Sequence, residues 1–159
     1  EHVPGVVGLG VAAAQATQWL NHNGHEAMWE LRDRFESAVG IAVPGACVNG
    51  QASSRMWSTS SIGFPELEAE LLLLVLSERG LDASAGSACS SGALKHSSVL
   101  EAMGRQPCQV PEESYGSIRF SWCRKTSRES LDRAVVLIAE AVAAVRGIEP
   151  PAGSILSTS

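Results

Sequence analysis

Near the C-terminal end of the sequence, the spacing of apolar residues changes from a period of two to a period of 3.6. Residues 117–122 alternate, with Ile118, Phe120 and Trp122 on one side and Arg119 on the other, which predicts a strand with one apolar face. Helical spacing follows, in Leu131, Val135, Ile138, Val142 and Val145. Because one-sided elements bury their apolar faces against each other, we expect an α/β or α+β layer fold in which helices cover a small sheet.

Elements of both kinds are expected in the rest of the chain. The predicted helices cover residues 4–20, 25–39, 65–79 and 99–103, and the predicted strands cover residues 44–50, 56–64 and 81–85. The first helix has no charge, so we expect it to be buried on most sides, unless it joins the second helix in one long helix bent near Gly24. Residues 126–129 form a capping box before the last helix. We expect a loop over residues 104–116 and a flexible tail over residues 148–159.

Size and composition indicate one globular domain. The 159 residues are 45% hydrophobic and carry a formal net charge of -5, so we expect a packed core. The basic residues are scattered, which argues against a nucleic-acid partner, and the run from Leu71 to Leu76 is too short to span a membrane. The cysteines are widely spaced and no secretory signal is visible. This pattern favours neither a metal site nor a disulfide framework, and we expect a cytoplasmic protein.

Residues 84–92 are all small and contain a thiol, that of Cys89. Small side chains and two glycines permit backbone excursions, so Cys89 could be carried between two positions. A thiolate is a nucleophile, and His96 is the nearest candidate for its base. The alternatives are an ordinary buried cysteine in a tight turn and an exposed histidine.

Arg119 is the second candidate site residue because it lies opposite the apolar row, with a serine on either side. A guanidinium group can bind a carboxylate through two parallel hydrogen bonds. The alternative for Arg119 is a surface or interdomain salt bridge. We interpret Arg55 as structural, and Cys47, Cys108 and Cys123 as packing or loop residues.

Three segments together resemble the cysteine desulfurases of the NifS and IscS type. They are residues 1–5 (EHVPG), 84–92 (SAGSACSSG) and 116–121 (GSIRFS), and their order and spacing also match. The likeness extends over about residues 1–147. Its most specific part surrounds Cys89, where the pattern S-x-G-S-A-C-[ST]-S is typical of the branch with a long, mobile cysteine loop.

The resemblance implies the class V aminotransferase architecture, fold type I, in which a large domain binds pyridoxal phosphate. Residues 1–24 would be the end of that domain and a linking helix, and residues 25–147 would be the small C-terminal domain. By the same likeness, Cys89 would attack the sulfur of the cysteine–cofactor adduct and release alanine. Its persulfide sulfur would pass to an acceptor or scaffold protein for iron-sulfur cluster or thio-cofactor assembly. Arg119 would bind the α-carboxylate of the L-cysteine substrate, and the complete enzyme would be a homodimer.

The cofactor lysine is where the sequence departs from this family. Pyridoxal phosphate is held by a lysine, and this chain has Lys95 and Lys125, neither of which lies in a segment like the family's Ser-x-His-Lys. The resemblance places that segment before Glu1. We therefore expect the C-terminal part of a longer enzyme, which by itself binds no pyridoxal phosphate and is inactive.

Two other functions remain compatible with the sequence. A non-catalytic sulfur-relay or interaction module could have the same fold and use residues 84–92 only to dock or to receive sulfur. A selenocysteine lyase or a cysteine sulfinate-type enzyme would also share the fold, and would depend differently on the thiol of Cys89.

Overall fold

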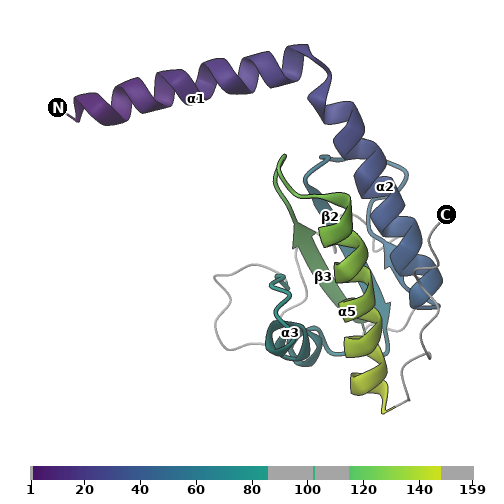
Figure 1. The fold of residues 1–159 in the computed structure, drawn as a ribbon. Helices are drawn as coiled ribbons and strands as arrows, with labels where there is room; N and C mark the ends of the chain where they lie inside the picture. Colours follow the sequence, from purple (N-terminus) through teal and green to yellow (C-terminus); the bar gives the residue numbers. More distant parts are fainter. Residues whose placement is uncertain (1, 86–101, 103–114, 148–159) are drawn as a thin grey trace.

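The computed structural model describes residues 2–85, 102 and 115–147. Within these ranges, helices and a small antiparallel sheet alternate along the chain (Figure 1). The elements are α1 (Val3–Asn21), α2 (Gly24–Ala42), β1 (Cys47–Val48), β2 (Thr59–Pro65), α3 (Ala69–Glu78), β3 (Tyr115–Ser121) and α5 (Arg128–Arg146). This arrangement confirms the predicted mixed helix and sheet layer fold.

The sheet has the strand order β1-β2-β3, and both pairs are antiparallel. Its register sets Ser61 of β2 opposite Arg119 of β3, and Ile62 opposite Ile118. Beyond β3, an isolated bridge pairs Ser84 with Arg119. The strand predicted over residues 81–85 is therefore reduced to a single bridging residue at the edge of the sheet.

The core lies between one face of the sheet and the helices α2, α3 and α5. Figure 1 shows α2 and α5 side by side in front of the sheet, and α3 packs against β3 and α5. The largest fully buried side chains are those of Phe64, Ile62, Leu72, Leu76, Ile118, Ile138, Val39 and Val43. Along β3, Ile118 and Phe120 are buried whereas Arg119 is exposed, so the predicted alternation is confirmed.

A close contact between α3 and β3 depends on a glycine. A Cβ atom at Gly116 would lie 2.5 Å from the carbonyl oxygen of Leu67 and 2.9 Å from the backbone nitrogen of Ala69. Since both neighbours are backbone atoms, neither can move aside without shifting the start of α3. Gly116 therefore lets β3 lie directly against the segment that leads into α3.

The expected burial of the first helix is wrong. No residue of α1 is buried, and Figure 1 shows the helix extending away from the sheet. Asn23 has a left-handed backbone, with φ of 54°, so α1 and α2 are separate helices. At this junction the Trp19 ring lies 5.2 Å from that of Trp57, between centroids. Apart from this end, α1 has little around it in the described part of the chain, which is why its apolar residues are exposed.

Two helix starts also differ from the prediction. Glu66 has a φ of 63° and Glu68 is extended, so α3 begins at Ala69 rather than at Pro65. The N-cap of α5 is Ser127 rather than Thr126, the first residue of the predicted capping box. The Ser127 hydroxyl oxygen accepts a hydrogen bond from the Ser130 backbone N–H. Of the short helix predicted at 99–103, residue 102 is described and is helical. The rest of that segment, most of the loop predicted at 104–116 and the tail predicted at 148–159 lie outside the described residues.

Candidate functional site

Arg119 lies at the centre of the polar face of the sheet. Its side chain is exposed, and among the described residues it forms no ion pair. On one side its strand partner is Ser61 of β2, and on the other it is Ser84, whose hydroxyl oxygen lies 3.4 Å from an Arg119 Nη2 donor. A guanidinium group without a carboxylate partner and flanked by small polar residues can accept an anionic ligand.

Hydrogen bonds between side chains continue across the same face. The Asn49 side-chain amide donates to the hydroxyls of Ser61 and Ser117, both at 3.1 Å. These residues come from three consecutive parts of the sheet: the end of β1, β2 and β3. The sequence placed serines on either side of Arg119 in the alternating segment, but Asn49 and Ser61 were not predicted to join this face because they come from other strands.

The predicted catalytic residue, Cys89, lies outside the described residues, as do Lys95, His96 and Cys108. The structure does describe the first residues of the small-residue segment. Ser84 exchanges two backbone hydrogen bonds with Arg119, of 3.1 and 2.7 Å. The segment that carries Cys89 thus starts directly beside the predicted substrate-binding arginine.

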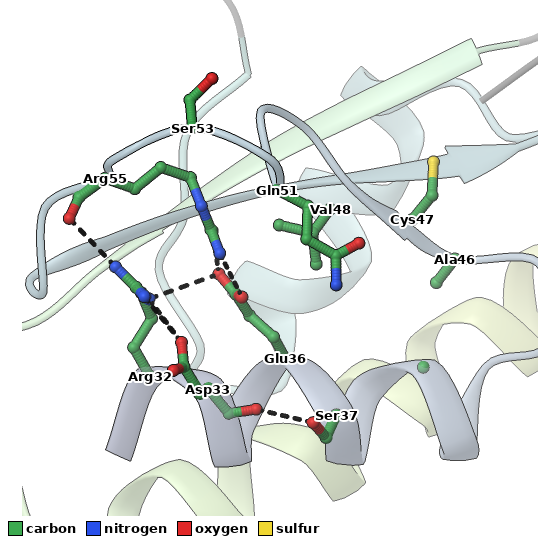
Figure 2. A pocket seen from close by; sticks show the side chains of 11 residues that line it. Arg32, Asp33, Glu36, Ser37, Ala46, Cys47, Val48, Gln51, Ser53 and Arg55 are labelled. Carbon is green, nitrogen blue, oxygen red and sulfur yellow. Dashed lines mark hydrogen bonds and ion pairs between the residues drawn. The ribbon is translucent and has the colours of Figure 1, made fainter. Parts of the chain in front are cut away.

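A buried charge network joins α2 to the segment that precedes β2 (Figure 2). Arg55 donates hydrogen bonds of 2.5 and 2.9 Å to the two carboxylate oxygens of Glu36, and the Ser60 hydroxyl donates another of 2.7 Å. Arg32 donates to the backbone oxygens of Arg55 and Met56, both at 3.1 Å. The hydrogen bonds with Glu36 raise the pKa of Arg55, although burial opposes them. Arg55 is therefore structural, as the sequence suggested.

The pocket beside this network is separate from the Arg119 face. Its lining includes Arg32, Glu36, Arg55 and Gln51, but not Arg119 (Figure 2). The charged groups in its wall already pair with one another, so they leave no free charge to bind a ligand. Sequence reasoning missed the buried Glu36, although its spacing of four residues from Arg32, next to the apolar Phe35, was a usable signal.

Comparison with known proteins identifies the family. The aminotransferase class-V family model matches residues 1–134. The chain belongs to this family. Among class V relatives, the cysteine desulfurase NifS of Azotobacter vinelandii is 38% identical over 151 residues, and a cysteine desulfurase of Trichormus azollae is 40% identical over 150 residues. Each alignment covers 94% of this chain and 36% of the relative, so the chain spans about a third of their length.

Solved structures agree with the class V assignment. One NifS-like protein superimposes with a TM-score of 0.69 at 27% sequence identity, covering 90% of this chain and 34% of the other. A NifS-like protein from Rickettsia africae gives a TM-score of 0.70 at 21% identity, covering 93% of this chain and 36% of the other. The first supports both family and fold, and the second supports the fold.

Class V enzymes imply pyridoxal phosphate, but the described residues do not fit this group. It requires a lysine amine in an enclosed site. The lysine in the described ranges, Lys125, is exposed in the turn between β3 and α5 and does not line the pocket beside the Glu36–Arg55 network. Within the same ranges no group of three His, Cys, Asp or Glu side chains could hold a metal ion, and no helix is long and apolar enough to cross a membrane.

The two cysteines in the described ranges differ in state. Cys47 is disulfide-bonded, which contradicts its interpretation as a packing or loop residue. Cys123 is free and exposed. A hydrogen bond from the Lys125 backbone N–H lowers the pKa of the Cys123 thiol, and the Thr126 hydroxyl adds to this effect. At neutral pH Cys123 therefore contains more thiolate than an unperturbed cysteine does.

Replacing Thr126 with Val is expected to shift the alkylation of Cys123 to higher pH, because the variant loses one hydrogen bond to the thiolate. The Lys125 N–H remains, so the shift is partial. The measurement is the rate of iodoacetamide labelling of Cys123, followed by mass spectrometry across pH 6 to 10. Ser130→Ala is the control, since Ser130 does not contact the sulfur. An inflection at the same pH in Thr126→Val and the parent would contradict the assignment.

Proposed function

We propose that this chain is the small-domain part of a pyridoxal-phosphate-dependent cysteine desulfurase. The reaction converts L-cysteine to L-alanine, leaves a persulfide on Cys89 and passes that sulfur to an acceptor protein. Family membership supports the reaction class. The observation that carries the proposal is the exposed guanidinium of Arg119, which forms no ion pair with any described residue and lies beside the first residues of the segment that contains Cys89.

In this proposal, Arg119 binds the α-carboxylate of L-cysteine and Cys89 acts on its sulfur. The Cys89 thiolate forms an S–S bond with the substrate sulfur, the substrate C–S bond breaks, and the thiol proton of the substrate ends on the β-carbon. The products are a Cys89 persulfide and alanine, so the step needs no external oxidant. Pyridoxal phosphate, when bound, supplies the electron sink for breaking the C–S bond.

The backbone pairing of Ser84 with Arg119 limits the distance between Cys89 and a substrate carboxylate bound by Arg119. Cys89 is the fifth residue after Ser84, and a fully extended chain covers at most about 3.6 Å per residue, or ~18 Å in all. An arm of that length can carry a thiol to a substrate held by Arg119 and away again to a partner. Small residues permit such a movement because they obstruct the backbone least.

The exposed α1 fits the role of a linking helix at the end of a large domain. It has no charged residue, and Val6 and Leu9 are 70% and 72% exposed. A helix of this composition gains stability when a neighbouring surface covers it. In the proposed enzyme, the large domain covers α1 and supplies the cofactor lysine, and the enzyme is a cytoplasmic homodimer.

The test joins this chain to an upstream class V domain that carries the cofactor lysine. The fused protein is expected to bind pyridoxal phosphate and to release alanine from L-cysteine, measured by amino-acid analysis, with one persulfide per turnover in the absence of a reductant. The 159-residue chain alone is the control and is expected to release none. If a fused protein that binds the cofactor forms no alanine, a sulfur-relay module becomes the better description.

A further inference from the structure

The pairing of Ser84 with Arg119 sets the directions of both side chains. The two residues exchange both of their backbone hydrogen bonds, Ser84 N–H to Arg119 O at 3.1 Å and Arg119 N–H to Ser84 O at 2.7 Å. In an antiparallel sheet, the side chains of such a directly opposed pair lie on the same face. The Ser84 hydroxyl is consequently beside the Arg119 side chain on the polar face.

The same hydrogen-bond pattern sets the type of pairing between Arg119 and its other strand neighbour, Ser61. Because the N–H and C=O of Arg119 both point to Ser84, its pairing with Ser61 is of the non-hydrogen-bonded type, in which Cα atoms are about 4.5 Å apart. One serine therefore lies on each side of Arg119: Ser61 on β2 and Ser84 beyond β3. Side chains of this size leave the guanidinium accessible from above the sheet.

A single side-chain contact restrains the guanidinium within the described residues. The Ser84 hydroxyl accepts a hydrogen bond of 3.4 Å from Arg119 Nη2. A guanidinium group has five N–H donors, so four remain: that of Nε, the second of Nη2 and both of Nη1. The two Nη atoms form the terminal edge of the group. This terminal edge can present two parallel donors to a carboxylate.

We propose that Ser84 is a positioning residue that aims the guanidinium of Arg119 at the substrate carboxylate. An exposed arginine samples many rotamers, and two-point binding of a carboxylate requires it to adopt one. A hydroxyl that holds one end of the guanidinium reduces that ordering cost before the ligand arrives. This inference rests on the proposed function, because it takes Arg119 as the carboxylate-binding residue.

The Ser84 hydroxyl is tested by comparing variants in the fused protein. In Ser84→Ala, the KM for L-cysteine is expected to rise about fivefold, with kcat changed less than about twofold, as for loss of one ordinary hydrogen bond. Ser84→Thr retains the hydroxyl and is expected to restore most of the affinity. Ser121→Ala is the matched control, since it removes a hydroxyl from an exposed position on the same face without a contact to Arg119.

A binding measurement separates positioning from a structural effect. Calorimetry with 3-mercaptopropionate, which cannot form a Schiff base, is expected to give a dissociation constant about fivefold higher in Ser84→Ala than in the parent. Its methyl ester, which lacks the charge, is expected to bind both proteins equally. A structural role would weaken both ligands, and that result, or equal dissociation constants for the acid, would overturn the inference.

The outcome also distinguishes this inference from the proposed function. If the parent fused protein forms no alanine, the proposed function fails. If the parent is active and Arg119→Lys raises the KM for L-cysteine at least tenfold while Ser84→Ala leaves it unchanged, the inference about Ser84 alone is wrong. Unfolding midpoints in urea, measured for each variant, identify any change that comes from lost folding.

Discussion

Replacing Cys89 with Ala is expected to reduce alanine formation by the fused enzyme by on the order of 10³-fold or more, as is found when an enzyme loses its nucleophile. In the proposed reaction, the Cys89 thiolate forms the bond that takes the sulfur from L-cysteine. No other group is proposed to replace it. The measurement is the rate of alanine release in the presence of a thiol reductant, with cofactor occupancy checked by absorbance.

Cys123→Ala is the matched control for this prediction, because it also removes one thiol. Cys123 is exposed and its pKa is lowered, so it is the described cysteine that would react most readily by itself. Its loss is expected to leave alanine release within about twofold of the parent. Full activity in Cys89→Ala, or a persulfide found by mass spectrometry on Cys123 and not on Cys89, would remove Cys89 from the mechanism.

Local patterns were sufficient to predict most of the secondary structure. The alternation around Arg119 predicted β3 and the exposure of that side chain, and the apolar spacing from Leu131 onward predicted α5. Both depend on a single periodic face that must be buried, which is a property of the segment itself. The start of α3 was missed because Glu66 has a left-handed backbone, with φ of 63°, which the local apolar spacing does not indicate.

Contacts between distant segments could not be predicted from one sequence. The bridge between Ser84 and Arg119 joins positions 35 residues apart, and the pairing of Glu36 with Arg55 spans 19 residues. Nothing in the local spacing indicates either partner. The burial of α1 was predicted from its composition alone, and composition does not reveal whether a neighbour is present to cover a helix.

A substitution in the buried network is expected to have the largest effect on stability. Glu36→Ala in the 159-residue chain should lower the free energy of unfolding by about 3–5 kcal/mol, the usual effect of removing one partner of a buried ion pair. The Glu36 side chain is 7% exposed, and its removal leaves the positive charge of Arg55 without its carboxylate. Since small domains have total stabilities of about 5–15 kcal/mol, this loss should be evident in urea unfolding followed by tryptophan fluorescence.

The exposed ion pair between Arg34 and Asp132 provides the control for the buried one. Its N–O distance is 3.1 Å, but the Arg34 side chain is 45% exposed, so Arg34→Ala should cost no more than about 1 kcal/mol. Glu36→Gln tests the role of charge, because the amide retains an acceptor for Ser60 but not the negative charge beside Arg55. An intermediate loss is expected for Glu36→Gln. If Glu36→Ala lowered the free energy of unfolding no more than Arg34→Ala does, the buried network would not be the interaction that attaches the segment before β2 to α2.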